Sequence, residues 1–168
     1  MVCDICEAPM REGTATEQRP YAYALGGLPH VGIVGISLYE CPNGHGVSPV
    51  IPRIAELHRV LVGAFVRKPA PLLGAELRFL RKHAGFSAQK FAALLAVDPA
   101  HLSRVEHDKA ALGASTDRLA RAIVLAAAGD KTVRDLLLKQ ADERLEKIRP
   151  LRRPLARMEK NRWKVGVA

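Results

Sequence analysis

Four possible metal ligands stand in two short clusters near the start of the chain. They are Cys3 with Cys6, with two residues between them, and Cys41 with His45, with three residues between them. Structural Zn²⁺ is held by four Cys or His side chains in a tetrahedron, commonly supplied as two clusters from distant parts of a chain. Pro42 and Gly44 favour a tight turn within the second cluster. A segment of about 50 residues is too small to form a hydrophobic core that is stable by itself. The sequence therefore predicts that bound Zn²⁺ cross-links and stabilises this segment.

The sequence leaves other uses of these side chains open. His30 or a water molecule can replace His45 as the fourth ligand, and the thiols can stand free without a metal. A redox dithiol is a further alternative, because a Cys-x-x-Cys pair can lower the pKa of one thiol. That motif normally lies near a βαβ pattern, whereas only two residues precede Cys3. Metal binding is therefore favoured over thiol chemistry.

Strand patterns occupy the first fifty residues, and helix patterns follow them. Residues 20–28 and 31–39 are rich in aromatic and β-branched residues, which indicates a small antiparallel ribbon. Pro52 can begin a helix, because its missing N–H costs nothing at a first helical position. The segment 68–71 indicates a linker, since each of its two prolines disfavours helix at the preceding residue. Mostly helical periodicity follows this segment.

These patterns predict an α+β chain in which a small zinc-clasped, β-rich N-terminal domain precedes an all-α helix-turn-helix domain. We expect four segments: a zinc-finger-like domain with a trailing helix at 1–66, a linker at 67–71, a helix-turn-helix domain with a C-terminal helix at 72–148, and a basic flexible tail at 149–168. The C-terminal helix is expected from Thr132 to about Ile148. The tail has seven basic residues against one acidic residue, so it can be a solvated extension or can follow phosphates.

Turn chemistry and core spacing indicate a helix-turn-helix in the centre of the chain. Gly85 can end a first helix, and Ser87 is suited to cap a second helix that follows at once. Asp98 can cap and Pro99 can begin a third helix, which is expected to run to about residue 106. The short turn between the second and third helices is the feature that indicates a DNA-binding motif.

The third helix is predicted to read DNA. Its Leu102 and Val105 are expected to face inward, and in this motif the outward face near the N-terminus of the helix enters the major groove. Arg104 can pair with O6 and N7 of guanine through two hydrogen bonds. Further contacts with bases or phosphates are expected from Ser87, Gln89, Lys90, Ala100, His101, Ser103 and Lys109. The alternative is a solvent-exposed helix in a protein-interaction module without a DNA role.

Two parts of the chain resemble known sequence patterns. Residues 72–128 resemble the phage-repressor (Cro-like, or XRE) helix-turn-helix in Gly85-Phe86-Ser87, Phe91-Ala92, Leu95-Ala96-Val97, 102–106 and Lys109. The upstream half resembles a YgiT-type zinc-finger segment in Gly27-Leu28-Pro29, Cys41-Pro42-Asn43 and 51–59. Together these parts resemble the MqsA antitoxin family over residues 1 to about 130.

The resemblance implies a homodimeric repressor of its own operon in a type II toxin–antitoxin system. It implies a palindromic operator in double-stranded DNA and a zinc-binding N-terminal domain that binds a partner toxin. It also implies a structural ion pair between Arg81 and Glu106. Three positions depart from the family. His45 comes one residue after the place of the last cysteine, and Ala88 and Ala100 replace a phosphate-binding glutamine and a base-reading asparagine. We therefore expect a different operator sequence.

Composition and length narrow the classes of protein further. No apolar run approaches the roughly 20 residues that span a bilayer, and no export signal is recognisable, so we expect a cytoplasmic location without membrane association. The formal net charge of +9 suits a polyanionic partner. The sequence has no convincing carboxylate pair, nucleophile motif or glycine loop for phosphates, so enzymatic activity is not expected.

Overall fold

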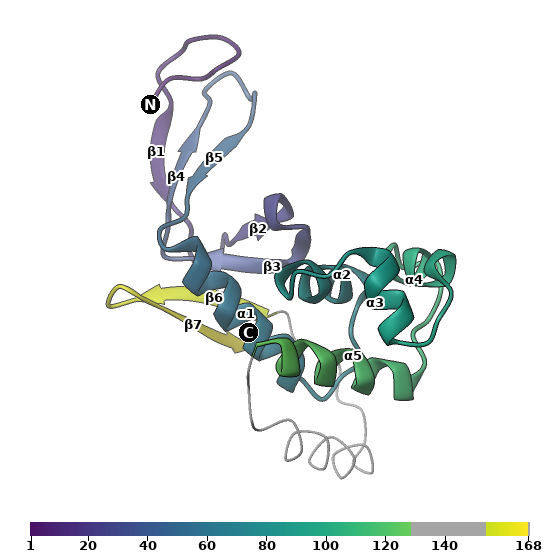
Figure 1. Cartoon of the computed structure of the whole chain (residues 1–168). Helices are drawn as coiled ribbons and strands as arrows, with labels where there is room; N and C mark the ends of the chain where they lie inside the picture. The colour runs from purple at the N-terminus through teal and green to yellow at the C-terminus, as the bar shows by residue number, and fades with distance from the viewer. Residues whose placement is uncertain (129–153, 168) are drawn as a thin grey trace. The chain divides into compact units, whose positions relative to one another are not determined.

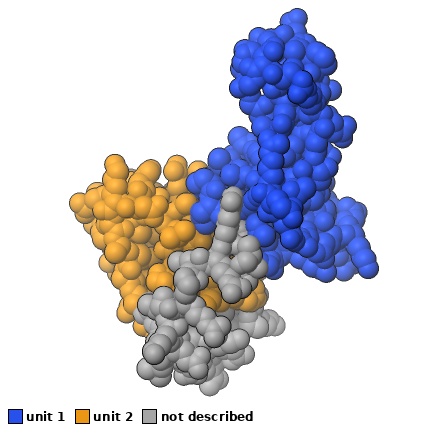
Figure 2. Space-filling view, turned by 180° about the vertical axis from the view of Figure 1, so that it is seen from behind, with its two compact units in different colours: residues 1–61, 152–168 blue, residues 62–151 orange. Residues whose placement is uncertain are grey.

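The computed structural model of the chain describes residues 1–128 and 154–167. The chain divides into two compact units, the first formed by residues 1–61 and 152–168 and the second by residues 62–151 (Figure 2). The boundary between the units falls inside helix α1 (Ile54–Arg67). The first unit therefore combines both ends of the chain, and the second unit is an insertion in its sequence.

The first unit contains the strands that the structure describes. They are β1 (Arg11–Thr14), β2 (Tyr21–Tyr23), β3 (Leu28–Val34), β4 (Ser37–Glu40), β5 (Val47–Val50), β6 (Pro154–Glu159) and β7 (Arg162–Val167). They form a three-stranded sheet in the order β1-β4-β5 and a four-stranded sheet in the order β2-β3-β6-β7 (Figure 1). A short 3₁₀ helix, η1 (Ala24–Gly26), joins β2 to β3.

The four-stranded sheet supplies much of the core of the first unit. Fully buried side chains on its strands include Leu28, Val31, Ile33 and Ala156. Tyr23 is also buried, and its hydroxyl lies 2.8 Å from Nε2 of His58 on α1. The N-terminal turns of α1 thus share a core with this sheet.

The C-terminal strands overturn the predicted fold class. β6 pairs in parallel with β3 and antiparallel with β7, so the C-terminal region contains strands and is not all-α. Residues 154–167 of the expected flexible tail form this hairpin. Trp163 is 4% exposed, and its Nε1–H donates to the carbonyl of Pro52 at 3.1 Å. The expectation of a flexible tail rested on Pro150, Pro154 and sparse apolar periodicity. The charged side chains of β6 and β7, however, occupy alternate positions and leave an apolar inner face.

Four helices of the second unit follow α1. They are α2 (Gly74–His83), α3 (Ala88–Leu94), α4 (Pro99–Glu106) and α5 (Ala114–Ala127). Eight apolar side chains of these helices are at most 3% exposed: Leu77, Leu80, Phe91, Ala92, Leu102, Val105, Ala120 and Val124. The helix expected from Thr132 to Ile148 lies outside the described residues. None of the helices in the two described ranges is long and apolar enough to cross a bilayer.

Buried hydrogen bonds hold the segment between α1 and α2. The guanidinium of Arg121 on α5 is 1% exposed and donates to Asp117 at 2.8 Å. It also donates to main-chain carbonyls at 2.6–3.3 Å, those of Phe65, Val66, Lys68 and Ala70. Asp117 accepts in turn from the N–H of Leu72 at 2.8 Å. Because a buried guanidinium must place its donors on acceptors, this pair fixes the path of the proline-containing segment.

Candidate functional site

The four predicted metal ligands meet at one end of the three-stranded sheet. Cys3 and Cys6 lie in the loop before β1, and Cys41 and His45 lie in the loop between β4 and β5 (Figure 1). Their ligand atoms all lie within 4.8 Å of one another. The structure therefore confirms a cluster that can hold a metal ion. His30, the alternative fourth ligand, lies on β3 and is not a member of this cluster.

Three distances between the ligand atoms are close to those of a tetrahedral zinc site. The Sγ atoms of Cys6 and Cys41 are 3.6 Å apart, and Nδ1 of His45 lies 3.7 Å from Sγ of Cys3 and 3.6 Å from Sγ of Cys41. With Zn–S bonds of about 2.3 Å and Zn–N bonds of about 2.0–2.1 Å, a tetrahedral site has S–S edges of about 3.8 Å and S–N edges of about 3.6 Å. Four protein ligands fill such a tetrahedron, as in structural rather than catalytic zinc sites.

Glycine backbone conformations shape the second loop. Gly44 and Gly46 have φ values of +77° and +132°, which disfavour residues with a Cβ. The N–H of Gly44 donates to the carbonyl of Cys41 at 3.1 Å, and the N–H of Cys41 donates to the carbonyl of Gly46 at 3.1 Å. These bonds close the loop, so that Cys41 and His45 bring their ligand atoms together.

Hydrogen-bond donors in both loops stabilise the thiolate of Cys6. The backbone N–H of Ala8 and the side-chain amide of Asn43, whose Nδ2 lies 3.4 Å from Sγ, lower the pKa of Cys6 to about 6. Zn²⁺ binds the thiolate rather than the thiol, so these donors favour the ligand form at neutral pH. Sequence reasoning placed Asn43 in a motif but did not recognise that it contacts a ligand.

Helix α4 divides into a buried side and an exposed side. Leu102 is fully buried and Val105 is 3% exposed, as their spacing indicates. Ala100, Ser103 and Arg104 are exposed. The outward side of α4 therefore offers a hydroxyl and a guanidinium beside a small side chain.

Side-chain caps define where α3 and α4 begin. Oδ1 of Asp98 accepts from the N–H groups of Ala100 and His101 at 2.8 and 3.1 Å. Oγ of Ser87 accepts from the N–H of Lys90 at 3.1 Å. Because each cap satisfies an N–H group that has no partner within the helix, both helices start at the positions that the sequence indicates.

The other predicted DNA-binding residues lie on or near these two helices. Gln89 and Lys90 are exposed on α3, and Lys109 is exposed just after α4. His101 is only half-buried on the first turn of α4. Ser87 is exposed, but its hydroxyl is engaged as the α3 cap. The structure thus places all of these residues at or near the surface.

A buried ion pair connects α2 to α4 and does not involve the exposed side of α4. Nε and Nη2 of Arg81 donate to the two carboxylate oxygens of Glu106 at 2.6 and 2.9 Å, and Nη1 donates to the carbonyl of Phe86 at 2.9 Å. Both side chains are at most 10% exposed. The Glu106 hydrogen bond raises the pKa of Arg81. This parallel pairing orients α4 relative to α2.

The fold and the metal cluster define a class of molecule: a β unit with a candidate metal centre, joined in sequence to a helical unit with two short helices separated by a tight turn. Comparisons with protein-family models, with curated proteins and with solved structures found no match for this chain. The chemistry of the chain's own residues is therefore the basis for its proposed function.

Proposed function

We propose that the chain is a sequence-specific DNA-binding transcription regulator with α4 as its recognition helix. The division of α4 into a buried side and an exposed side bearing Ser103 and Arg104 carries this proposal. A guanidinium on the exposed side of such a helix has the donor geometry to reach O6 and N7 of guanine. The Asp98 cap orders the first turn of the helix, where contacts with bases are made in helix-turn-helix proteins.

Contacts with phosphates are proposed for the residues around α4. Gln89, Lys90 and Lys109 are exposed, and each can contact the DNA backbone without reading sequence. A homodimer would place two copies of α4 about 34 Å apart, which is one helical turn of DNA. A palindromic operator is the expected target of such a dimer.

Zn²⁺ is the proposed ion of the four-ligand cluster, and its proposed role is structural. Three sulfur donors and one imidazole nitrogen are ligands that Zn²⁺ prefers. When bound, the ion would cross-link the loop before β1 to the loop between β4 and β5. The four ligand atoms already lie within 4.8 Å of one another, so the two loops are close enough to share one ion.

Autorepression within a toxin–antitoxin operon extends the proposal. It is supported by the resemblance of the zinc-finger-like and helix-turn-helix segments to the MqsA antitoxin family. Co-expression with the product of the neighbouring gene tests this part. A neighbour that arrests growth alone, and whose arrest is relieved by a complex with this chain, is expected. A neighbour with no effect on growth would contradict the antitoxin role without affecting the DNA-binding role.

The DNA-binding role is tested by selecting duplexes from a random pool with the full chain. Arg104→Ala should lower affinity for the selected duplex by about 1–3 kcal/mol and relax the preference at one base pair. Arg59→Ala is a matched control, because Arg59 is an exposed arginine of the first unit and its loss removes the same charge. A pool in which no sequence becomes enriched would reject sequence-specific binding.

A zinc-containing protein-interaction module is the second candidate function. The observation that favours it is apolar surface beside the metal ligands, where Met1, Val2 and Ile5 are 64%, 59% and 71% exposed. Side chains of this kind commonly become buried in protein interfaces. A salt-sensitive, sequence-selective complex with DNA would favour the regulator over this module.

A further inference from the structure

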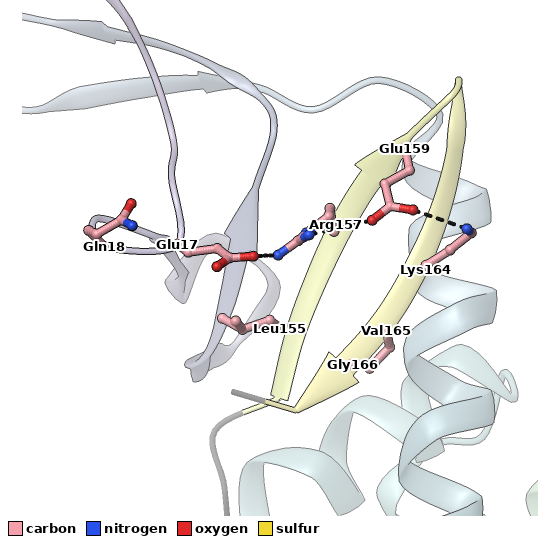
Figure 3. Close-up of a pocket in the computed structure, with 8 residues that line it drawn as sticks. All are labelled: Glu17, Gln18, Leu155, Arg157, Glu159, Lys164, Val165 and Gly166. Atoms are coloured by element: carbon pink, nitrogen blue, oxygen red, sulfur yellow. Dashed lines mark hydrogen bonds and ion pairs between the residues drawn. The ribbon is translucent and has the colours of Figure 1, made fainter.

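The β6–β7 hairpin separates its side chains into an inner face and an outer face. Ala156 and Trp163 on the inner face are buried. The outer face carries two cross-strand pairs, Arg157 opposite Lys164 and Glu159 opposite Arg162. Glu17 and Gln18 border the same face, which forms an open hollow of about 660 Å³ (Figure 3). The face is therefore polar and accessible.

Charges within the hollow are compensated by one another. Arg157 contacts Glu17 and lies 3.5 Å from Glu159, and Nζ of Lys164 lies 3.0 Å from Glu159 (Figure 3). The two cations and two carboxylates sum to zero. This part of the outer face consequently has no excess charge to attract an anion.

The hairpin tip, residues 160–162, differs from the hollow in its charge. Lys160 and Arg162 are exposed, and neither forms an ion pair within the described part of the chain. Nearby, the Arg53 guanidinium donates to the carbonyl of Asn161, and Arg53 also pairs with Glu56. The tip thus has two cations without an ion pair, although Glu159 lies opposite Arg162 across the hairpin.

The tip is also held in a defined shape. Lys160 and Asn161 have φ values of 45° and 60°, the conformation of a tight two-residue hairpin turn. Trp163, next to the tip, is anchored by its bond to the carbonyl of Pro52. A pre-ordered pair of cations loses less entropy on binding an anion than the same residues in a flexible tail.

We infer that the tip of the β6–β7 hairpin is a second, sequence-independent DNA contact, in which Lys160 and Arg162 bind phosphates of the duplex backbone. This inference rests on the proposed function in that it takes DNA as the partner. Two adjacent cations on a narrow ribbon match the repeated negative charge of a duplex strand. α4 supplies base recognition, and the hairpin tip adds affinity that does not depend on sequence.

The test measures affinity of the full chain for a duplex of random sequence across a salt series. Each phosphate contact adds about 0.9 to the slope of log affinity against log salt concentration, so Lys160→Gln with Arg162→Gln should reduce that slope by about 2. The charge-retaining pair Lys160→Arg with Arg162→Lys should keep it. The emission of Trp163, the single tryptophan of the chain, checks that the hairpin is folded in each variant.

Arg11→Gln with Arg59→Gln is the matched control, because it removes the same charge from exposed arginines elsewhere in the first unit. An unchanged slope in the tip variant, or an equal reduction in the control, would overturn the inference. Binding of the tip to anionic phospholipid vesicles with unchanged DNA binding would also overturn it. Loss of sequence preference in Arg104→Ala is a separate readout, so failure of the recognition helix and failure of the hairpin contact can be distinguished.

Discussion

Gly74, the first residue of α2, packs directly against the backbone carbonyl of Val105 near the end of α4. A Cβ built on Gly74 would overlap that oxygen. The N–H of Gly74 also donates to Oδ1 of Asp108 at 2.8 Å. This close approach of two backbones complements the Arg81–Glu106 ion pair and fixes the position of α4 relative to α2.

Gly74→Ala should therefore destabilise the helical unit. Since the added methyl group meets backbone rather than a movable side chain, we expect a loss of about 1–3 kcal/mol in the free energy of unfolding. Urea titration followed by circular dichroism measures it. Gly63→Ala is the control, because its Cβ would meet only the flexible guanidinium of Arg67 at 3.0 Å. That control should be neutral or gain up to about 1 kcal/mol; equal effects of the two variants would contradict the packing argument.

Glu106→Ala is expected to lower the free energy of unfolding by about 3–5 kcal/mol, because it leaves the buried guanidinium of Arg81 without its carboxylate partner. The same urea titration measures this change. Arg78→Ala, at an exposed position on the same helix as Arg81, should change stability by less than about 0.5 kcal/mol. A loss below about 1 kcal/mol in Glu106→Ala would show that the pair does not hold α2 and α4 together.

Ala96→Gly should stabilise the chain by about 0.5–1 kcal/mol. Ala96 follows α3 with φ of +54°, a left-handed conformation in which glycine avoids the strain of a Cβ. Ala93→Gly, at an exposed position inside α3, should instead destabilise by a similar amount. Thermal unfolding of both variants gives the comparison. A lower melting temperature in Ala96→Gly would be inconsistent with strain at this turn.

Metal removal should unfold the end of the three-stranded sheet that holds the cluster. We expect about one Zn²⁺ per chain by elemental analysis, and a lower melting temperature after chelation that added Zn²⁺ restores. His45→Ala should reduce the metal content and lower the melting temperature, whereas His30→Ala should retain about one equivalent. Retention of full metal content in His45→Ala, with loss in His30→Ala, would reverse the assignment of the fourth ligand.

Local signals in the sequence were sufficient to predict the metal cluster and the residues at which α3 and α4 begin. The spacing of Cys3 and Cys6 and the glycine-containing turn near His45 restrict where ligands can point. Asp98 followed by Pro99 specifies a helix start by chemistry within three residues of the chain. Such features depend on neighbours in sequence, so a single sequence can reveal them.

Long-range pairing was the part that sequence reasoning missed. The parallel pairing of β3 with β6 brings together Ile33 and Ala156, which are far apart in the chain. The signal in the C-terminal segment was the alternation of apolar and charged residues on either side of Lys160 and Asn161. It was missed because Pro150, Pro154 and the sparse helical periodicity of apolar residues indicated a flexible tail. Gly74 gave no local signal, because its role depends on the close approach of α4.

Recognition of a base pair by Arg104 is the central element of the proposed function. The decisive measurement is the ratio of affinities, at one salt concentration, between the selected duplex and duplexes with single base-pair changes. For the wild-type chain, we expect a ratio of roughly 5- to 150-fold at the base pair that Arg104 contacts, and a ratio near one at that base pair in Arg104→Ala. Ratios that are the same in the two proteins at every position would contradict recognition of DNA by α4.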